Sequence, residues 1–114
     1  MIRIKGVEPR MIANNLTPYI PVHPGGILKE EIEYRGISQS KLAEQIGMSY
    51  KVLNHILNEH RPLTTTTAMM FEAALGIPAY LLANMQTDYN LQVAKQDNKF
   101  VEKLSKIKKI AAML

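Results

Sequence analysis

The sequence predicts an all-α fold in which an extended N-terminal arm precedes five short helices and a C-terminal amphipathic helix. From Pro24 onward, apolar residues recur at helical spacing in short segments, and most of these segments are closed by glycine or proline. Four prolines within the first 24 residues prevent a long helix there. The chain has 114 residues, of which 46% are hydrophobic, enough for one domain with a buried core.

Composition excludes several classes of function. The chain has no cysteine, which removes disulfides, thiolate metal sites and a cysteine nucleophile. No apolar run approaches the ~18 residues of a membrane span, so we expect a cytoplasmic protein with no membrane partner. The formal charge of +4 is concentrated at the ends, since residues 1–27 carry +2, residues 96–114 carry +3 and the middle carries −1. Net basicity alone is therefore a weak argument for nucleic-acid binding.

We expect three parts: an arm over residues 1–23, a helical domain over residues 24–95 and a C-terminal helix over residues 96–114. In the arm, Ile2 and Ile4 alternate with Arg3 and Lys5, a pattern typical of a short strand or an extended segment. We interpret this region as an arm.

The first helix is predicted from about Gly25 to Arg35, with Gly36 as its C-cap. Its apolar side is expected to hold four residues: Ile27, Leu28, Ile32 and Tyr34. The second helix begins after Ser38, a good N-cap, and ends before Gly47.

Three more helices follow in the domain. The third runs from Ser49 to about Asn58, because Pro62 prevents continuation. The fourth is capped by Thr64 and leads to Gly76, and its Met69-Met70 pair is expected to fill the core. The fifth opens around residue 78 and continues to about residue 95.

The last helix is indicated by five apolar residues at spacings of 4, 3, 4 and 3. They are Phe100, Leu104, Ile107, Ala111 and Leu114. This is one stripe of an amphipathic helix, with the lysines largely off it. Such a helix either packs on the bundle or binds a partner.

The stretch from Ser38 to Asn58 has the layout of a helix-turn-helix, two helices joined by a turn at Gly47-Met48-Ser49. At 100° per residue, the third helix separates into a polar arc and an apolar arc that do not overlap. The polar arc holds Tyr50, Lys51, Asn54, His55 and Asn58, and the apolar arc holds Val52, Leu53, Ile56 and Leu57.

A solvated surface helix would show the same separation, so the composition of the polar arc decides between the two readings. An ordinary solvated face is rich in Glu and Lys, whereas this arc has amides, an imidazole, a phenol and a single lysine. These groups donate to and accept from base edges and phosphates. The arc contains no acid, which favours a recognition helix in the DNA major groove.

Three segments together resemble a known family. The central one runs Ser38-Gln39-Ser40-Lys41-Leu42-Ala43-Glu44-Gln45-Ile46-Gly47-Met48-Ser49, and it resembles the signature of the phage repressor and Cro superfamily, or XRE family. His23-Pro24-Gly25-Gly26-Ile27-Leu28 and Asn84-Met85-Gln86-Thr87-Asp88-Tyr89-Asn90-Leu91 resemble the opening and closing segments of the HigA (VapI-like) antitoxins. The resemblance covers about residues 22–95. Two positions depart from the family pattern, since Glu59 stands where glycine is usual and Leu82 where many members have tryptophan.

The resemblance implies a repressor-like DNA-binding domain with two sets of contacts. The base-facing positions are Ser49, Tyr50, Lys51, Asn54 and His55. The DNA backbone positions are Ser38, Gln39, Asn58, His60 and Arg61. Because one recognition helix reads only a few base pairs, we also expect a homodimer on a palindromic operator. Its candidate interface holds Leu81, Met85 and Tyr89, with the stripe of the last helix as a further candidate.

The resemblance further implies an antitoxin that neutralises a HigB-type, mRNA-cleaving toxin and represses its own operon. The toxin contact is expected on the arm with the acidic residues Glu30, Glu31 and Glu33, or on the C-terminal helix. The alternative is a stand-alone repressor without a toxin. An enzyme such as a small ribonuclease is disfavoured, because no nucleophile–base pair or metal-ligand set is apparent and the three histidines do not form one. No cofactor is expected.

Overall fold

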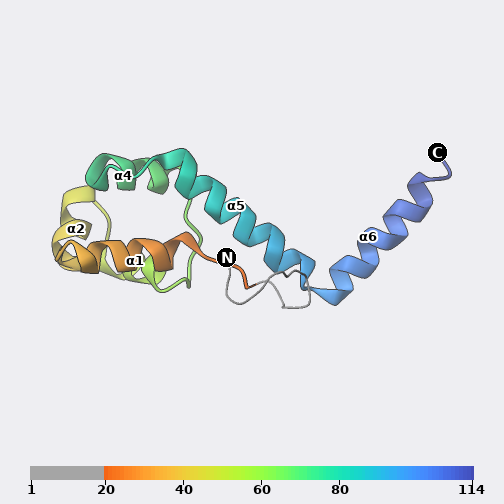
Figure 1. Cartoon of the computed structure of the whole chain (residues 1–114), viewed down its shortest axis with the longest axis horizontal. Helices are drawn as coiled ribbons and strands as arrows, with labels where there is room; N and C mark the ends of the chain where they lie inside the picture. The colour runs from red at the N-terminus through yellow and green to blue at the C-terminus, as the bar shows by residue number, and fades with distance from the viewer. Residues whose placement is uncertain (1–19) are drawn as a thin grey trace, which may run out of the picture.

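The computed structural model describes residues 20–114, and this part of the chain contains six helices and no strand (Figure 1). The helices are α1 (Pro24–Tyr34), α2 (Gln39–Ile46), α3 (Tyr50–Leu57), α4 (Thr65–Leu75), α5 (Ala79–Lys95) and α6 (Asn98–Ala111). The predicted all-α fold is confirmed. Most of the predicted arm, including the alternation at its start, lies outside the described residues and stays a prediction.

Side-chain caps set the helix starts where the sequence predicts them. The hydroxyls of Ser38, Ser49 and Thr64 each accept a hydrogen bond from the backbone N–H three residues later, which begins α2, α3 and α4. The helices α2 and α4 end at Gly47 and Gly76, whose φ angles of 72° and 78° lie in the left-handed region that glycine adopts without strain.

The core is formed by side chains from the first five helices and the loop before α4. Its buried members are Leu28, Ile32, Leu42, Ala43, Leu53, Ile56, Leu57, Leu63, Ala68, Phe71, Leu75 and Leu82. Leu82 of α5 is fully buried in this core.

Two predictions about burial are wrong. On α1, Leu28 and Ile32 are buried, but Ile27 and Tyr34 are 42% and 89% exposed, because within residues 20–114 the helices α3 and α5 pack on the other side of α1. The Met69-Met70 pair is also exposed rather than core filling, since α4 turns Ala68, Phe71 and Leu75 inward instead.

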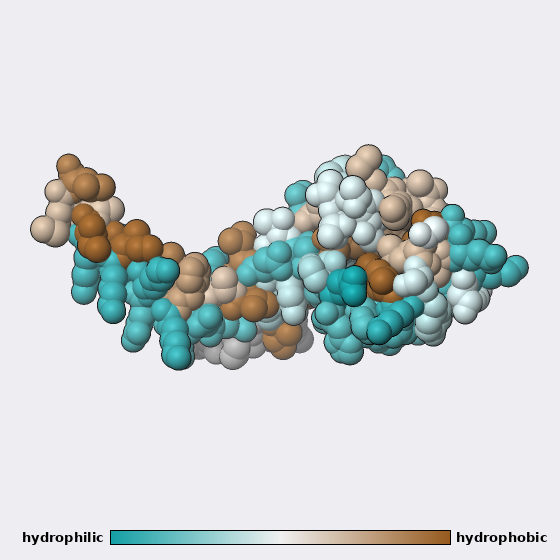
Figure 2. All heavy atoms as spheres, turned by 180° about the vertical axis from the view of Figure 1, so that it is seen from behind, coloured by the Kyte–Doolittle hydropathy of each residue, from teal (hydrophilic) through white to brown (hydrophobic). Residues whose placement is uncertain are grey.

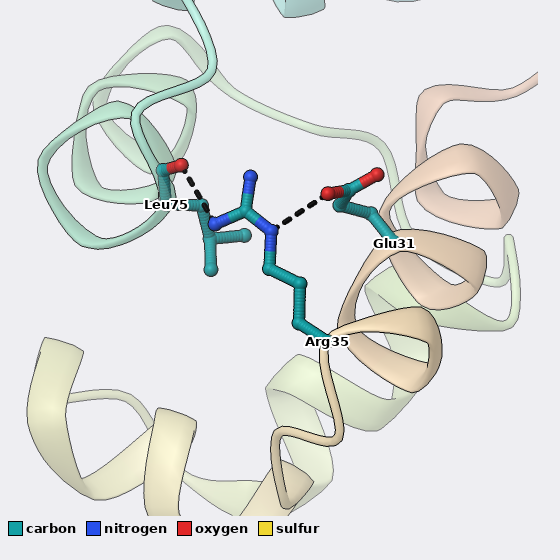
Figure 3. Close-up of polar contacts among 3 residues, drawn as sticks. All are labelled: Glu31, Arg35 and Leu75. Carbon is teal, nitrogen blue, oxygen red and sulfur yellow. Dashed lines mark hydrogen bonds and ion pairs between the residues drawn. The ribbon is translucent and has the colours of Figure 1, made fainter.

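Arg35 ties the end of α1 to the end of α4 (Figure 3). Its Nε donates to the Glu31 carboxylate at 2.6 Å, and its Nη1 donates to the carbonyl of Leu75 at 2.9 Å. The second bond satisfies one of the carbonyls that a helix leaves without a partner at its C-terminus. The bond therefore joins the C-terminal ends of α1 and α4.

The last helix, α6, leaves the bundle and extends away from it (Figure 1). Asp97 caps its start by accepting from the N–H groups of Lys99 and Phe100. None of its residues is buried, and its neighbour in the chain, α5, is the helix it contacts most within residues 20–114. The helix therefore does not pack on the bundle. No helix among the described residues has the length and apolar character needed to cross a lipid bilayer.

Candidate DNA-binding surface

The helices α2 and α3 form the predicted helix-turn-helix. Gly47 ends α2 in the left-handed conformation, and the N–H of Met48 closes the turn by donating to the carbonyl of Ala43 at 2.9 Å. Ser49 then starts α3, because its hydroxyl accepts from the N–H of Val52 at 3.1 Å. The inner sides of both helices lie in the core, so α3 is held on a rigid support.

The outer side of α3 carries the predicted polar arc. Tyr50 is 52% exposed and Lys51 is exposed, whereas Asn54 and His55 are half-buried. Opposite them, Leu53, Ile56 and Leu57 are buried. The structure thus places the base-facing candidates along one accessible side of α3, next to Ser49 at its start.

Gln39 at the start of α2 is joined to Asn54 of α3. The Asn54 amide nitrogen donates to the Gln39 side-chain oxygen at 3.2 Å. This bond leaves the Gln39 NH₂ group as a donor and the Asn54 oxygen as an acceptor. The first suits a phosphate oxygen and the second suits the amino group of a base.

The side chain of Asn58 makes two hydrogen bonds within the chain. Its amide nitrogen donates to the carbonyl of Asn54 at 2.9 Å, and its oxygen accepts from the ammonium of Lys29 at 2.9 Å. Lys29 comes from α1, so the structure brings to the end of α3 a cation that the sequence analysis did not identify. No local signal points to it, because the two residues are 29 positions apart.

At Glu59, where the resemblance implies a glycine, the turn after α3 has the left-handed backbone of a tight turn. Glu59 has φ 66°, the only positive φ of a non-glycine residue within residues 20–114. His60 and Arg61 follow and are exposed. The turn also brings the imidazole of His60 to 6.1 Å from that of His55, between ring centroids.

His23 joins this turn to the bundle. It is 3% exposed, its Nδ1 accepts from the N–H of Gly25 at 2.8 Å, and its ring meets the edge of Tyr89 at 4.9 Å. Burial lowers the pKa of His23 below its ordinary value, while the charge of Glu59 and a hydrogen bond to the backbone of Arg61 oppose this shift. Because the lowered pKa and the accepted N–H bond both favour the neutral imidazole, His23 acts as the N-cap of α1.

The dimer candidates on α5 differ in accessibility. Leu81 is exposed, Met85 is half-buried, and Tyr89 is half-buried with its ring against His23. Tyr89 therefore contributes to packing within its own chain. Within residues 20–114, no group of three or more metal-ligating side chains could hold a metal ion.

Comparisons with known proteins agree with this geometry. A helix-turn-helix family matches residues 28–82, from α1 to the first turn of α5. Virulence-associated protein I of Dichelobacter nodosus is 37% identical over 81 residues, which cover 70% of this chain and 75% of that protein.

Two solved structures have the same fold. An addiction module antidote protein of the HigA family from Coxiella burnetii is 32% identical, with a TM-score of 0.65, over 73% of this chain and 92% of that one. The Pseudomonas aeruginosa antitoxin HigA, solved with the higBA promoter, is 29% identical, with a TM-score of 0.67, over 74% of this chain and 94% of that one. The two-helix unit, its polar recognition side and these relatives lead to one assignment: the chain belongs to the helix-turn-helix family of the XRE type, a family of DNA-binding proteins.

Proposed function

We propose that this protein is a DNA-binding antitoxin of the HigA type that represses its own operon and neutralises a HigB-type, mRNA-cleaving toxin. The observation that carries the DNA-binding part is the outer side of α3, where Lys51 and Asn54 are accessible and no acid is present. Two similar proteins are an antidote protein and an antitoxin, the second solved with promoter DNA, and they support both parts of the proposal.

In this proposal, α3 lies in the major groove and the start of α2 faces the DNA backbone. Lys51 donates to acceptors on guanine, and the Asn54 oxygen accepts from the amino group of a base. Gln39, held by Asn54, donates its NH₂ group to a phosphate. Two copies of the chain present two α3 helices to the half-sites of a palindrome, so the proposal includes a homodimer.

Gel-shift measurements on the promoter upstream of the protein's own gene test the DNA-binding part. Lys51→Ala and Asn54→Ala should each weaken specific binding by about 1–3 kcal/mol where a bidentate contact is lost. The matched controls Lys95→Ala and Asn84→Ala remove the same side chains from α5 and should bind as the wild type does. Wild-type affinity of both α3 variants would contradict the assignment of α3.

Gln39→Ala separates phosphate contacts from base contacts. Because a phosphate contact carries no sequence information, this variant should weaken binding to the promoter and to unrelated DNA by the same factor. Gln45→Ala, which removes an exposed glutamine from the end of the same helix, is the control. A loss confined to the promoter would mean that Gln39 reads a base.

The toxin contact must lie away from α3 if the complex also binds DNA, and we place it on the N-terminal arm. Co-expression with the neighbouring reading frame, followed by pull-down and growth rescue, tests this part. A variant without residues 1–20 should lose rescue and keep promoter binding. Full rescue by that variant would exclude the arm, and a neighbour that is neither toxic nor co-purified would favour a stand-alone repressor.

A further inference from the structure

The outer side of α1 carries an apolar pair flanked by acids. Ile27 and Tyr34 are exposed and lie seven residues apart, two helical turns along the same line of α1. Glu30 and Glu31 lie between them, one on each side of that line. Glu31 is already paired with Arg35, so Glu30 supplies most of the negative charge that a partner would meet. We call these four residues the acidic strip of α1.

The helix α6 carries the complementary arrangement. Phe100, Leu104 and Ile107 form an exposed apolar line, and Ile107 is 52% exposed. Lys103 and Lys108 border this line on its two sides. Figure 2 shows the hydrophobic band along one side of the projecting helix and hydrophilic side chains along the other. We call these five residues the basic strip of α6.

Charge selects the partner of the basic strip. The helix α6 holds five lysines and one glutamate, Glu102, so it carries a net charge of +4. If two α6 helices paired along their apolar lines, Lys103 and Lys108 would occupy the positions beside the seam and repel their counterparts. Two heptads are also short for a coiled coil. The acidic strip offers the opposite charge around an apolar centre of the same kind.

A second copy of the chain can supply that strip. Within one chain, α6 extends away from the bundle that contains α1 (Figure 1). If each copy gives its α6 to the α1 of the other, the two contacts are related by a twofold axis and the assembly closes as a dimer. The exchange would cover the apolar residues of the two strips.

We propose that the basic strip of α6 packs on the acidic strip of α1 in a second copy, and reciprocally. This inference rests on the homodimer of the proposed function and names the surfaces that form it. It assigns the outer side of α1 to the second copy and leaves the arm for the toxin.

Cross-linking of cysteine variants tests the contact, since the chain has no cysteine of its own. Tyr34→Cys protein is mixed with Ile107→Cys protein and treated with a short bismaleimide. A covalent heterodimer is expected. Ser105→Cys, on the opposite side of α6, is the matched control and should give little cross-linked product with Tyr34→Cys. A product between two Ile107→Cys chains only, or no product from a monomeric protein, would overturn the inference.

Charge reversal gives a second, independent readout. Glu30→Lys should weaken self-association about tenfold, and adding Lys103→Glu should restore it. Both residues are exposed, so circular dichroism should show an unchanged fold. Failure of restoration would overturn the charge pairing. A dimer that binds the promoter but gives no α1–α6 cross-link contradicts this inference alone. A cross-linked dimer that does not bind the promoter contradicts the proposed function alone.

Discussion

His23 and Glu59 connect the start of α1 to the turn that follows the recognition helix. The His23 ring receives the N–H of Gly25, and the Glu59 carboxylate lies over Gly26 in the first turn of α1. A negative charge is favourable at a helix N-terminus, which offsets part of the cost of the left-handed backbone at Glu59. Glu59 therefore makes a contact at this turn that a glycine could not make.

The first prediction at this scale concerns pH and His23. Because burial lowers the pKa of folded His23, the unfolded chain takes up the proton first as the pH falls. Neutral His23 therefore contributes to the free energy of unfolding. This contribution is fully present above the ordinary histidine pKa of about 6.5 and is lost as the pH falls through the lowered pKa of folded His23. Urea unfolding is measured at about pH 7.5 and about pH 5.5. Between these values, the free energy of unfolding should fall more for the wild type than for His23→Gln. Equal losses would contradict the buried, neutral imidazole.

At the scale of elements, the helix bounds could be predicted because their signals are local. Ser38, Ser49, Thr64 and Gly76 each act within three or four residues of their own position, and the structure shows the caps they predict. The polar arc of α3 could be predicted for the same reason, since one helical period defines it.

Contacts between elements could not be predicted in this way. The outward position of Tyr34 depends on which side of α1 meets α3 and α5. The bond between Lys29 and Asn58 depends on how α1 crosses α3. Likewise, α6 has the pattern of a packed helix, and only the structure shows that its own bundle does not cover it.

The crossing of α1 and α3 gives the second prediction. A Cβ at Gly25 would collide with the backbone carbonyl of Ile56, which cannot rotate aside. Gly25→Ala should therefore destabilise the protein by about 1–3 kcal/mol and displace α3. Gly26→Ala is the matched control, because its Cβ would meet only the flexible end of Glu59, and it should stay within ~1 kcal/mol of the wild type. Equal denaturation midpoints for the two variants would contradict this close packing.

At the scale of the whole molecule, the chain combines a compact bundle with a helix that stands apart from it, giving extents of 54 × 40 × 21 Å. A row of exposed apolar side chains on such a helix is unfavourable in water. The described part of one chain leaves this row uncovered, and the proposed dimer would remove this unfavourable exposure. Dimerisation would also supply the second recognition helix that a palindromic operator requires.

Light scattering at micromolar concentration gives the third prediction. The wild type should have about twice the chain mass of 12.9 kDa. Leu104→Glu with Ile107→Glu should give a monomer, because both changes place acids in the apolar line of α6. A double variant that remains a dimer would contradict an interface on α6 and favour the α5 candidates, of which Leu81 is the most exposed.

DNase I footprinting of the full-length protein on the promoter of its own gene tests the central claim most directly, that a dimer reads specific DNA through α3. We expect two protected half-sites about one helical turn apart, with related and inverted sequences. Protection should persist when unrelated DNA is added in excess, because base contacts distinguish the operator from other sequences. A single protected half-site, or protection that unrelated DNA removes at equal concentration, would contradict the account.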